Sequence, residues 1–241
     1  MRTLHPFPGG VQPPEHKHES SQTPIQTAPL PRRLGVYLRQ HLGAPAKPVV
    51  APGEAVLKGQ TIAVPDGYVS AAVHAPASGR VVAIEPVAFP HPSGLPDSAI
   101  VIEPDGEERW VARTPLDWRQ SPREALLQRL QESGIVGLGG AVFPTHVKFS
   151  VAPGSIETLI FNGAECEPWL TSDDRLMQER ADAIAAGIAI LRHLAAPGET
   201  LVAIEDNKPA AIAAMQRALA GSGVEVVVVP TRYPTGSEKQ L

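Results

Sequence analysis

The sequence predicts an all-β part, a small barrel or sandwich, followed by an α/β domain with a parallel sheet. Two observations predict this combination. Between residues 32 and 105, short runs of β-branched residues alternate with Gly-containing turns roughly every 8–12 residues, which is typical of small β domains. From about residue 115, helical spacing of apolar residues alternates with short apolar runs, which is typical of parallel α/β sheets.

The composition restricts the possible classes of protein. Of the 241 residues, 43% are hydrophobic, which is enough for a core and argues against global disorder. The formal net charge of −4 argues against nucleic-acid binding, because that needs a basic surface. The single cysteine, Cys166, excludes an internal disulfide and a cluster bound by four cysteines of this chain. Apolar runs are shorter than the ~18 residues of a membrane span, and the N-terminus lacks a signal-peptide pattern, so we expect a soluble cytosolic protein without membrane insertion.

The first two parts of the chain are an arm and the β domain. Residues 1–31 are rich in proline and polar residues, and we expect an extended N-terminal arm that lies on another part of the protein. Residues 32–105 form the predicted barrel or sandwich. Its strands are expected at 49–50, 56–57, 61–64, 69–73, 80–84 and 99–102, with a proline-rich loop at 86–96.

Residues 106–241 form the predicted α/β domain. Ser121 as N-cap, Pro122 in the first turn and Glu124 in a capping box predict a helix start, and Gly134 predicts its end. Asn207 is expected to cap a second helix. The remaining elements are a strand at 158–161, one long helix from about 173 to 194, a strand at 201–204, a helix from about 208 to 220, and a strand at 224–229 that is buried on both faces.

A Gly-rich segment is the first candidate binding site. Gly137, Gly139 and Gly140 leave the backbone bare, so its N–H groups can approach a phosphate or a flat ring, and Thr145 and Lys148 add a hydroxyl and a positive charge. The spacing matches neither the dinucleotide-binding fingerprint, because Val142 takes its last position, nor a P-loop. Without other information, a simple turn is the commoner explanation of such a segment.

Two further candidate segments follow predicted strands, where parallel sheets bind ligands. Residues 162–168 carry carboxylates that can accept hydrogen bonds from ribose hydroxyls, although a solvated acidic turn before a helix N-terminus is the commoner explanation without other information. Cys166 stands between two carboxylates, which disfavour a thiolate nucleophile. Residues 233–241 form the other segment, and the chain stops in what resembles an unfinished helix, so we expect a truncated protein. His16 and His18 are better explained by a solvated arm than by a metal site, and no metal ligand is predicted.

Four motifs in order resemble the RnfC family, the NADH-side subunit of the Rnf electron transport complex. The later half is also similar to the FMN-binding domain of the NADH-oxidising subunit of respiratory complex I. Residues 52–60 and 75–79 are similar to the barrel-sandwich hybrid of biotinyl and lipoyl carriers. These resemblances imply a barrel-sandwich hybrid followed by a parallel-sheet FMN-binding domain. The RnfC-like motifs are residues 7–17, 137–145, 162–177 and 205–209.

The resemblance implies FMN and NAD(H) as cofactors. Hydride transfer from NADH to flavin needs no side-chain acid or base, so no catalytic residue is expected. Val142 replaces a glycine of complex I, and Ala164 and Ser237 replace acidic residues. The implied cofactor-binding residues are Gly137, Gly139, Gly140, Ala141, Phe143, Thr145, Lys148, Asn162, Glu165, Glu167, Tyr233, Gly236 and Glu238.

The resemblance also implies partners and a location. RnfC proteins carry two [4Fe–4S] clusters on a C-terminal module, and this chain ends before such a motif, so none is expected here. We expect a peripheral protein on the cytoplasmic side of the bacterial inner membrane, with other Rnf subunits, NADH and ferredoxin as partners and coupling to ion translocation. The alternative is a non-catalytic docking or assembly module. A carrier would need a lysine at the hairpin tip, where the sequence has Asp66, Gly67 and Tyr68.

Overall fold

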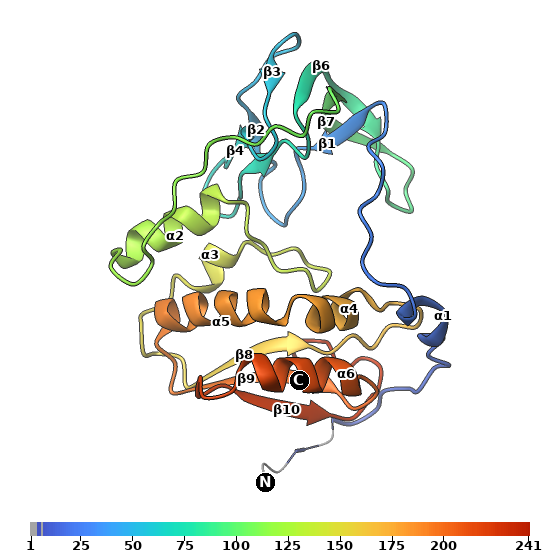
Figure 1. Ribbon diagram of the computed structural model, residues 1–241, viewed down its shortest axis with the longest axis vertical. Helices are drawn as coiled ribbons and strands as arrows, with labels where there is room; N and C mark the ends of the chain where they lie inside the picture. Colours follow the sequence, from blue (N-terminus) through green and yellow to red (C-terminus); the bar gives the residue numbers. More distant parts are fainter. Residues whose placement is uncertain (1–3, 6) are drawn as a thin grey trace. The chain divides into compact units, whose positions relative to one another are not determined.

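The protein forms two compact units in a computed structural model that describes residues 4–5 and 7–241. One unit combines residues 1–27 with residues 151–241, and the other comprises residues 28–150 (Figure 1). The N-terminal arm therefore packs with the last third of the chain, although the whole β domain separates the two in sequence. Segment 106–150 groups with the β domain.

The unit of residues 28–150 contains two antiparallel sheets. β1 (Leu34–Tyr37), β7 (Pro96–Pro104), β6 (Gly79–Ala88) and β3 (Ala55–Val56) form one sheet in this order, and β2 (Lys47–Pro48), β4 (Thr61–Val64) and β5 (Val73–His74) form the other. Ile62 of β4 and Val81 and Ile102 of the first sheet are fully buried in one core, so the sheets pack face to face. The predicted small β domain is confirmed.

Three details of the β unit differ from the expectation. β1 was not predicted, because its four residues lack a preceding Gly turn. The hairpin of β6 and β7 extends to Ala88 and Pro96, which shortens the expected loop to residues 89–95. Of the expected strand 69–73, only Val73 pairs, because residues 69–72 form an irregular segment.

Two helices follow the barrel in the same unit, α2 (Arg123–Glu132) and α3 (Thr145–Lys148). The predicted N-cap of α2 is wrong by one residue. Pro122 is the capping residue and has no side-chain hydrogen bond, while the Ser121 hydroxyl donates to the Asp117 carbonyl at 2.7 Å. Gly134, with φ +66°, follows the helix as predicted.

The other unit contains a parallel sheet of β8 (Thr158–Gly163), β9 (Glu199–Glu205) and β10 (Glu225–Val229), in the order β10-β9-β8. Helices α4 (Ser172–Glu179), α5 (Ala181–Ala195) and α6 (Pro209–Ala218) pack on the face that carries Val202 and Ile204 (Figure 1). On the opposite face Leu241 packs against a second cluster of sheet residues. The parallel α/β architecture is confirmed.

Sequence patterns misplaced three features of this unit. The Val-rich β10 lies at an edge with alternating burial, and β9 is the strand that is buried on both faces, because it is central. The expected long helix is divided into α4 and α5 at Arg180, whose φ and ψ of −132° and 26° are not helical. Asn207 does not cap α6, because its side chain bonds Glu15 and Lys208 instead.

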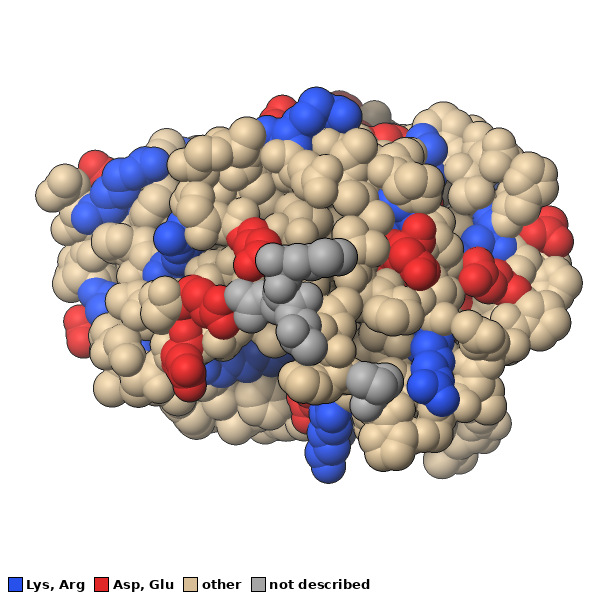
Figure 2. All heavy atoms as spheres, turned by 90° about the horizontal axis from the view of Figure 1, so that it is seen from below, with Lys and Arg blue, Asp and Glu red and all other residues tan. Residues whose placement is uncertain are grey.

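The arm has little regular structure of its own, as predicted. Its one helix among the described residues, α1 (His18–Ser21), is a single turn. On the face shown in Figure 2, basic and acidic side chains are interspersed, and no large area carries a single sign. Within residues 4–5 and 7–241, no helix has both the length and the apolar composition that a bilayer crossing requires.

Candidate functional site

Two of the three predicted segments meet at the carboxyl end of the parallel sheet. The Asn162 amide donates to the Gly236 carbonyl at 2.7 Å, and its oxygen accepts from the Ala164 N–H at 3.0 Å. A Cβ on Gly236 would lie 2.9 Å from the Ala164 carbonyl oxygen, so only glycine permits this close approach. The loop after β8 and the bend of residues 233–238 therefore form one site.

Glu165 serves the fold within this site. Its side chain is 3% exposed, and its Oε1 accepts hydrogen bonds from the Asp173 N–H at 2.8 Å and the Ser172 hydroxyl at 3.2 Å. These donors belong to the first turn of α4, so Glu165 caps that helix, whereas Thr171 at the capping position makes no such bond. Glu167 is exposed, and its carboxylate is the one that this loop offers to a ligand.

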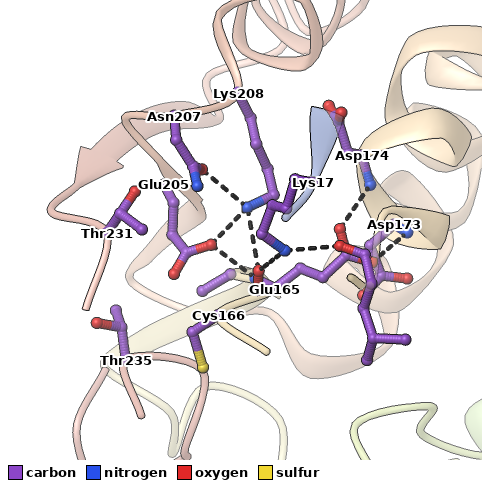
Figure 3. Close-up of polar contacts among 12 residues, drawn as sticks. Lys17, Glu165, Cys166, Asp173, Asp174, Glu205, Asn207, Lys208, Thr231 and Thr235 are labelled. Atoms are coloured by element: carbon purple, nitrogen blue, oxygen red, sulfur yellow. Dashed lines mark hydrogen bonds and ion pairs between the residues drawn. The ribbon is translucent and has the colours of Figure 1, made fainter. Parts of the chain in front are cut away.

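A buried ion pair holds the loop at Glu165 (Figure 3). Lys208 Nζ lies 2.5 Å from Glu205 Oε2, and the two side chains are 1% and 0% exposed. The same ammonium donates to the Glu165 carbonyl at 3.2 Å, and Glu205 Oε2 accepts the Glu165 N–H at 3.1 Å. Both polar groups of the Glu165 backbone are therefore fixed by one ion pair.

The arm contributes a second ammonium group. Lys17 Nζ donates to the carbonyl oxygens of Glu165 at 2.6 Å, Glu167 at 3.0 Å and Leu170 at 2.6 Å. Burial, and then the charge of Lys208, lower the pKa of Lys17. Lys17, Glu205 and Lys208 were not predicted as site residues. The only sequence signal was that they fall within RnfC-like motifs.

The electrostatics of the loop disfavour a nucleophilic cysteine. Burial, and then the charges of Glu167 and Glu205, raise the pKa of the Cys166 thiol, although its contact with the Gly236 backbone opposes them. Burial and the nearby Glu165 and Glu167 also raise the pKa of Asp173. Both shifts follow from the negative character of this end of the sheet.

A hollow of about 410 Å³ opens beside the loop, within the same unit. The arm contributes Gln12 and Glu15 to its lining, and Cys166, Asn207 and Tyr233 come from the ends of the three strands. The Tyr233 main chain pairs with Val11 of the arm through two hydrogen bonds of 2.9 Å. Tyr233 and Glu238 are both exposed at this end of the sheet.

The third predicted segment lies in the unit of residues 28–150. Val136 and Pro144 form an antiparallel bridge, and the Gly137 N–H donates to the Phe143 carbonyl at 2.9 Å, which closes a loop with residues 137–143 at its tip. The Leu42 N–H donates to the Val142 carbonyl at 3.1 Å. Thr145 is buried where α3 begins, and Phe143 is half-buried.

The tip of this loop presents an open glycine face. A Cβ on Gly139 or Gly140 would meet no atom within 4 Å, and the φ of +91° at Gly140 favours glycine. Lys148 is exposed, and its Nζ lies 2.7 Å from where a Gly137 Cβ would be. Val142 has φ +48°, a left-handed backbone conformation that a β-branched residue rarely adopts.

The tip of the hairpin between β4 and β5 is hydrogen-bonded to residues on both sides of the Gly-rich loop. The Gln131 amide donates to the Gly67 carbonyl at 3.2 Å, and His146 Nε2 lies 2.8 Å from the Tyr68 carbonyl. Lys58 forms an ion pair with Glu108 and lies over the Trp110 ring. The tip is therefore part of a packed scaffold, unlike the free tip of a carrier.

Comparison with known proteins defines the class. A family model described as RnfC barrel sandwich hybrid domain matches residues 5–107, and one described as Nuo51 FMN-binding domain matches residues 130–241. The protein thus joins a barrel-sandwich hybrid to an FMN-binding α/β domain, as predicted.

Curated relatives define the family. The chain is 55% identical over 243 residues to the C subunit of the ion-translocating oxidoreductase complex of Pseudomonas aeruginosa, covering 100% of this chain and 31% of that protein. The same component of Serratia proteamaculans is 51% identical and that of Yersinia pseudotuberculosis is 53% identical, each over 237 residues, with 98% of this chain and 34% of the relative covered. The chain belongs to the RnfC family. It spans about a third of the length of these curated relatives.

Solved structures give only a distant likeness. An NAD+-reducing [NiFe]-hydrogenase in the air-oxidized state is 22% identical with a TM-score of 0.42, covering 52% of this chain and 26% of that chain. A likeness of this size supports no conclusion about this protein.

Proposed function

We propose that this chain is the FMN-binding, NAD(H)-reactive part of an RnfC-family subunit. The observation that carries the proposal is the open glycine face at Gly139 and Gly140, within a segment that the FMN-binding family model matches. A flat ring needs such a bare backbone surface, because any side chain would separate the ring from the N–H groups.

The residues present fit FMN. Gly139 and Gly140 offer the open backbone surface beside the exposed Ala141, whereas the Gly137 N–H is bonded to the Phe143 carbonyl and closes the loop. The exposed Lys148, beside Gly137, offers a positive charge for the phosphate. In the other unit, we propose as ligand contacts the polar side chains that are exposed at the carboxyl end of the parallel sheet, namely Asn162, Glu167, Tyr233 and Glu238. Gly236 keeps Asn162 in place, and Glu165, whose side chain caps α4, acts on the shape of the loop rather than on a ligand.

When bound, FMN supplies a ring that takes up two electrons as hydride and releases them singly. The chain's own residues bind and orient the cofactor and NADH. No side chain is required as acid or base in hydride transfer, so we assign none.

The test is an FMN titration followed by flavin fluorescence, with two variants. Gly139→Leu places a side chain on the open face and is expected to weaken FMN binding by at least about tenfold without lowering the unfolding midpoint. Gly187→Leu is the matched control, because its Cβ also meets nothing within 4 Å but lies on α5. If the unaltered protein shows no saturable binding at micromolar concentration, the proposal is wrong.

The names of the relatives support partners and a location. They are subunits of an ion-translocating oxidoreductase complex, so we infer that this protein binds other subunits of such a complex. We also propose a peripheral place on the cytoplasmic side of the inner membrane, which the resemblance to RnfC implies. There it would exchange electrons with NADH, ferredoxin and the two [4Fe–4S] clusters expected in RnfC proteins.

One observation favours a docking role as the second candidate. Leu138 at the tip of the Gly-rich loop is 83% exposed, more than any other large hydrophobic side chain of the described residues, and a partner protein that covered it would remove this apolar surface from water. Under this alternative, other members of the complex would capture the chain equally well with and without Gly139→Leu, and FMN would not bind.

A further inference from the structure

The arm holds the loop after β8 by its backbone. Lys17 Nζ donates its hydrogen bonds to three carbonyl oxygens of one six-residue stretch, those of Glu165, Glu167 and Leu170. Lys17 and Glu165 are 148 positions apart in sequence, so this is a tertiary contact and not a local turn. An ammonium has three donors and no acceptor, which matches three converging carbonyls.

Neighbouring arm residues hold the same stretch. The Ser20 hydroxyl donates to the Trp169 carbonyl at 2.7 Å, and the Trp169 N–H donates to the Glu15 carbonyl at 2.9 Å. The His16 ring stacks on the Trp169 ring with centroids 4.7 Å apart. Four residues of this stretch are thus hydrogen-bonded to the arm, namely Glu165, Glu167, Trp169 and Leu170.

The loop needs support of this kind. Trp169 has φ +69°, a left-handed conformation that a bulky residue rarely adopts because of steric strain. A flexible loop would relax away from it, so the arm contacts select this conformation. The same loop carries the exposed Glu167 side chain and directly follows the exposed Asn162 at the end of β8.

We propose that Lys17 is a positioning residue of the candidate flavin site, which fixes the loop after β8 in one conformation before the cofactor binds. This inference rests on the proposed FMN binding. Ordering a loop in advance removes an entropy cost from binding, so loss of Lys17 weakens affinity even though Lys17 itself need not touch the cofactor.

A second ammonium completes the arrangement. Lys208 donates to the same Glu165 carbonyl from the start of α6, so this oxygen receives hydrogen bonds from two lysines (Figure 3). Lys208 is fully buried beside Glu205, whereas Lys17 is half-buried and reachable by reagents. Lys17 is therefore the member of the pair that an experiment can replace and restore.

The test uses the full chain and Lys17→Met, with Lys47→Met as a matched control on an exposed lysine of the β unit. We expect Lys17→Met to raise the Kd for FMN by about tenfold and to speed amide hydrogen exchange in residues 165–170. Ser20→Ala, which removes one hydrogen bond to the loop, should act in the same direction but less. Lys47→Met should change neither quantity.

Chemical rescue separates positioning from general damage. Lys17→Cys treated with 2-bromoethylamine regains an ammonium at nearly the lysine length, and should regain the original Kd and exchange rates. The same variant treated with iodoacetamide should not. The buried Cys166, whose thiol has a raised pKa, should stay unmodified, and peptide mass mapping would verify this.

The outcomes are distinguishable. If the unaltered chain binds FMN and Lys17→Met binds equally well, or if the amide reagent rescues as well as the amine reagent, the role of Lys17 is refuted while the proposed function stands. If the unaltered chain binds no FMN, the proposed function falls and this role of Lys17 falls with it.

Discussion

The buried ion pair of Lys208 and Glu205 gives the sharpest prediction about stability. Lys208→Met leaves a side chain of similar volume but removes the cation from a carboxylate that is 0% exposed. Loss of one partner of a buried pair costs about 3–5 kcal/mol, because the remaining carboxylate stays buried from water without the cation that is bonded to it. The ammonium also donates to the Glu165 carbonyl at 3.2 Å and to Asn207 Oδ1 at 3.0 Å, which favours the upper half of this range.

At about 1.4 kcal/mol per factor of ten, this loss raises the unfolding equilibrium constant by roughly a hundredfold to a few thousandfold. The assay is urea unfolding at pH 7, followed by the fluorescence of Trp169, which lies in the same unit as Lys208. Trp110→Phe and Trp118→Phe in the background remove the tryptophans of the other unit.

The double variant Lys208→Met with Glu205→Gln tests the cause. Glutamine keeps an oxygen that can accept the Glu165 N–H and carries no charge, so we expect it to recover at least about half of the lost stability. A loss below about 1 kcal/mol in the single variant, or no recovery in the double variant, would refute the reasoning that an unpaired buried charge causes the effect.

Three further predictions follow from single contacts. Asp105 accepts hydrogen bonds from Arg109, Ser78 and the Glu107 N–H, and these lower its pKa to about 2. The ionised carboxylate therefore stabilises the fold above pH ~4, and this stabilisation is lost as the pH falls towards ~2. Asp105→Asn should flatten the pH dependence of the thermal unfolding midpoint in that window. Cys166 should react with a disulfide reagent at pH 8 far more slowly than free cysteine, and labelling at the free-cysteine rate would contradict its burial and raised pKa. Gly236→Ala should lower stability by about 1–3 kcal/mol in urea unfolding, because its Cβ would lie 2.9 Å from the Ala164 carbonyl oxygen, and an unchanged midpoint would count against that close approach.

The fold was predictable where local sequence determines it. Gly turns at short intervals set the strands of the barrel, and short apolar runs between helical patterns set β8 and β9. Burial depends on neighbours instead. The Val-rich β10 has the sequence of a central strand but lies at an edge, because strand order is decided by the crossovers and not by strand composition.

Helix ends were less predictable, because distant groups replaced local ones. Ser121 and Asn207 have the chemistry of capping residues, yet neither caps its helix. The N-terminus of α4 is capped by Glu165, which lies seven residues before Ser172 and outside the usual capping position. The division at Arg180 carries no proline or glycine signal, so helical periodicity continued through it.

The candidate site shows the same distinction. The bare glycines at 139 and 140 were identified from sequence, since absence of a side chain is a local property. The role of Lys17 was not, because a polar run of the arm appears solvated until its partners, 148 positions away, are known. The meeting of Asn162 with Gly236 was expected only from the general rule that strand ends share an edge.

The number of acidic residues in the motifs overstates the negative charge that a phosphate-bearing ligand meets. Glu205 is paired with Lys208, and the ammonium of Lys17 lies against the backbone of Glu165, whose carboxylate is buried at the positive end of α4. These two cations offset these two anions within the described residues of the cluster, so Glu167 is the exposed carboxylate that remains in this loop. Removal of either lysine therefore makes the site more negative as well as less ordered. Salt screens the contribution of charge to FMN binding but leaves the contribution of loop order unchanged. The weakening of FMN binding by Lys17→Met should therefore be smaller at high ionic strength than at low ionic strength, but it should not vanish.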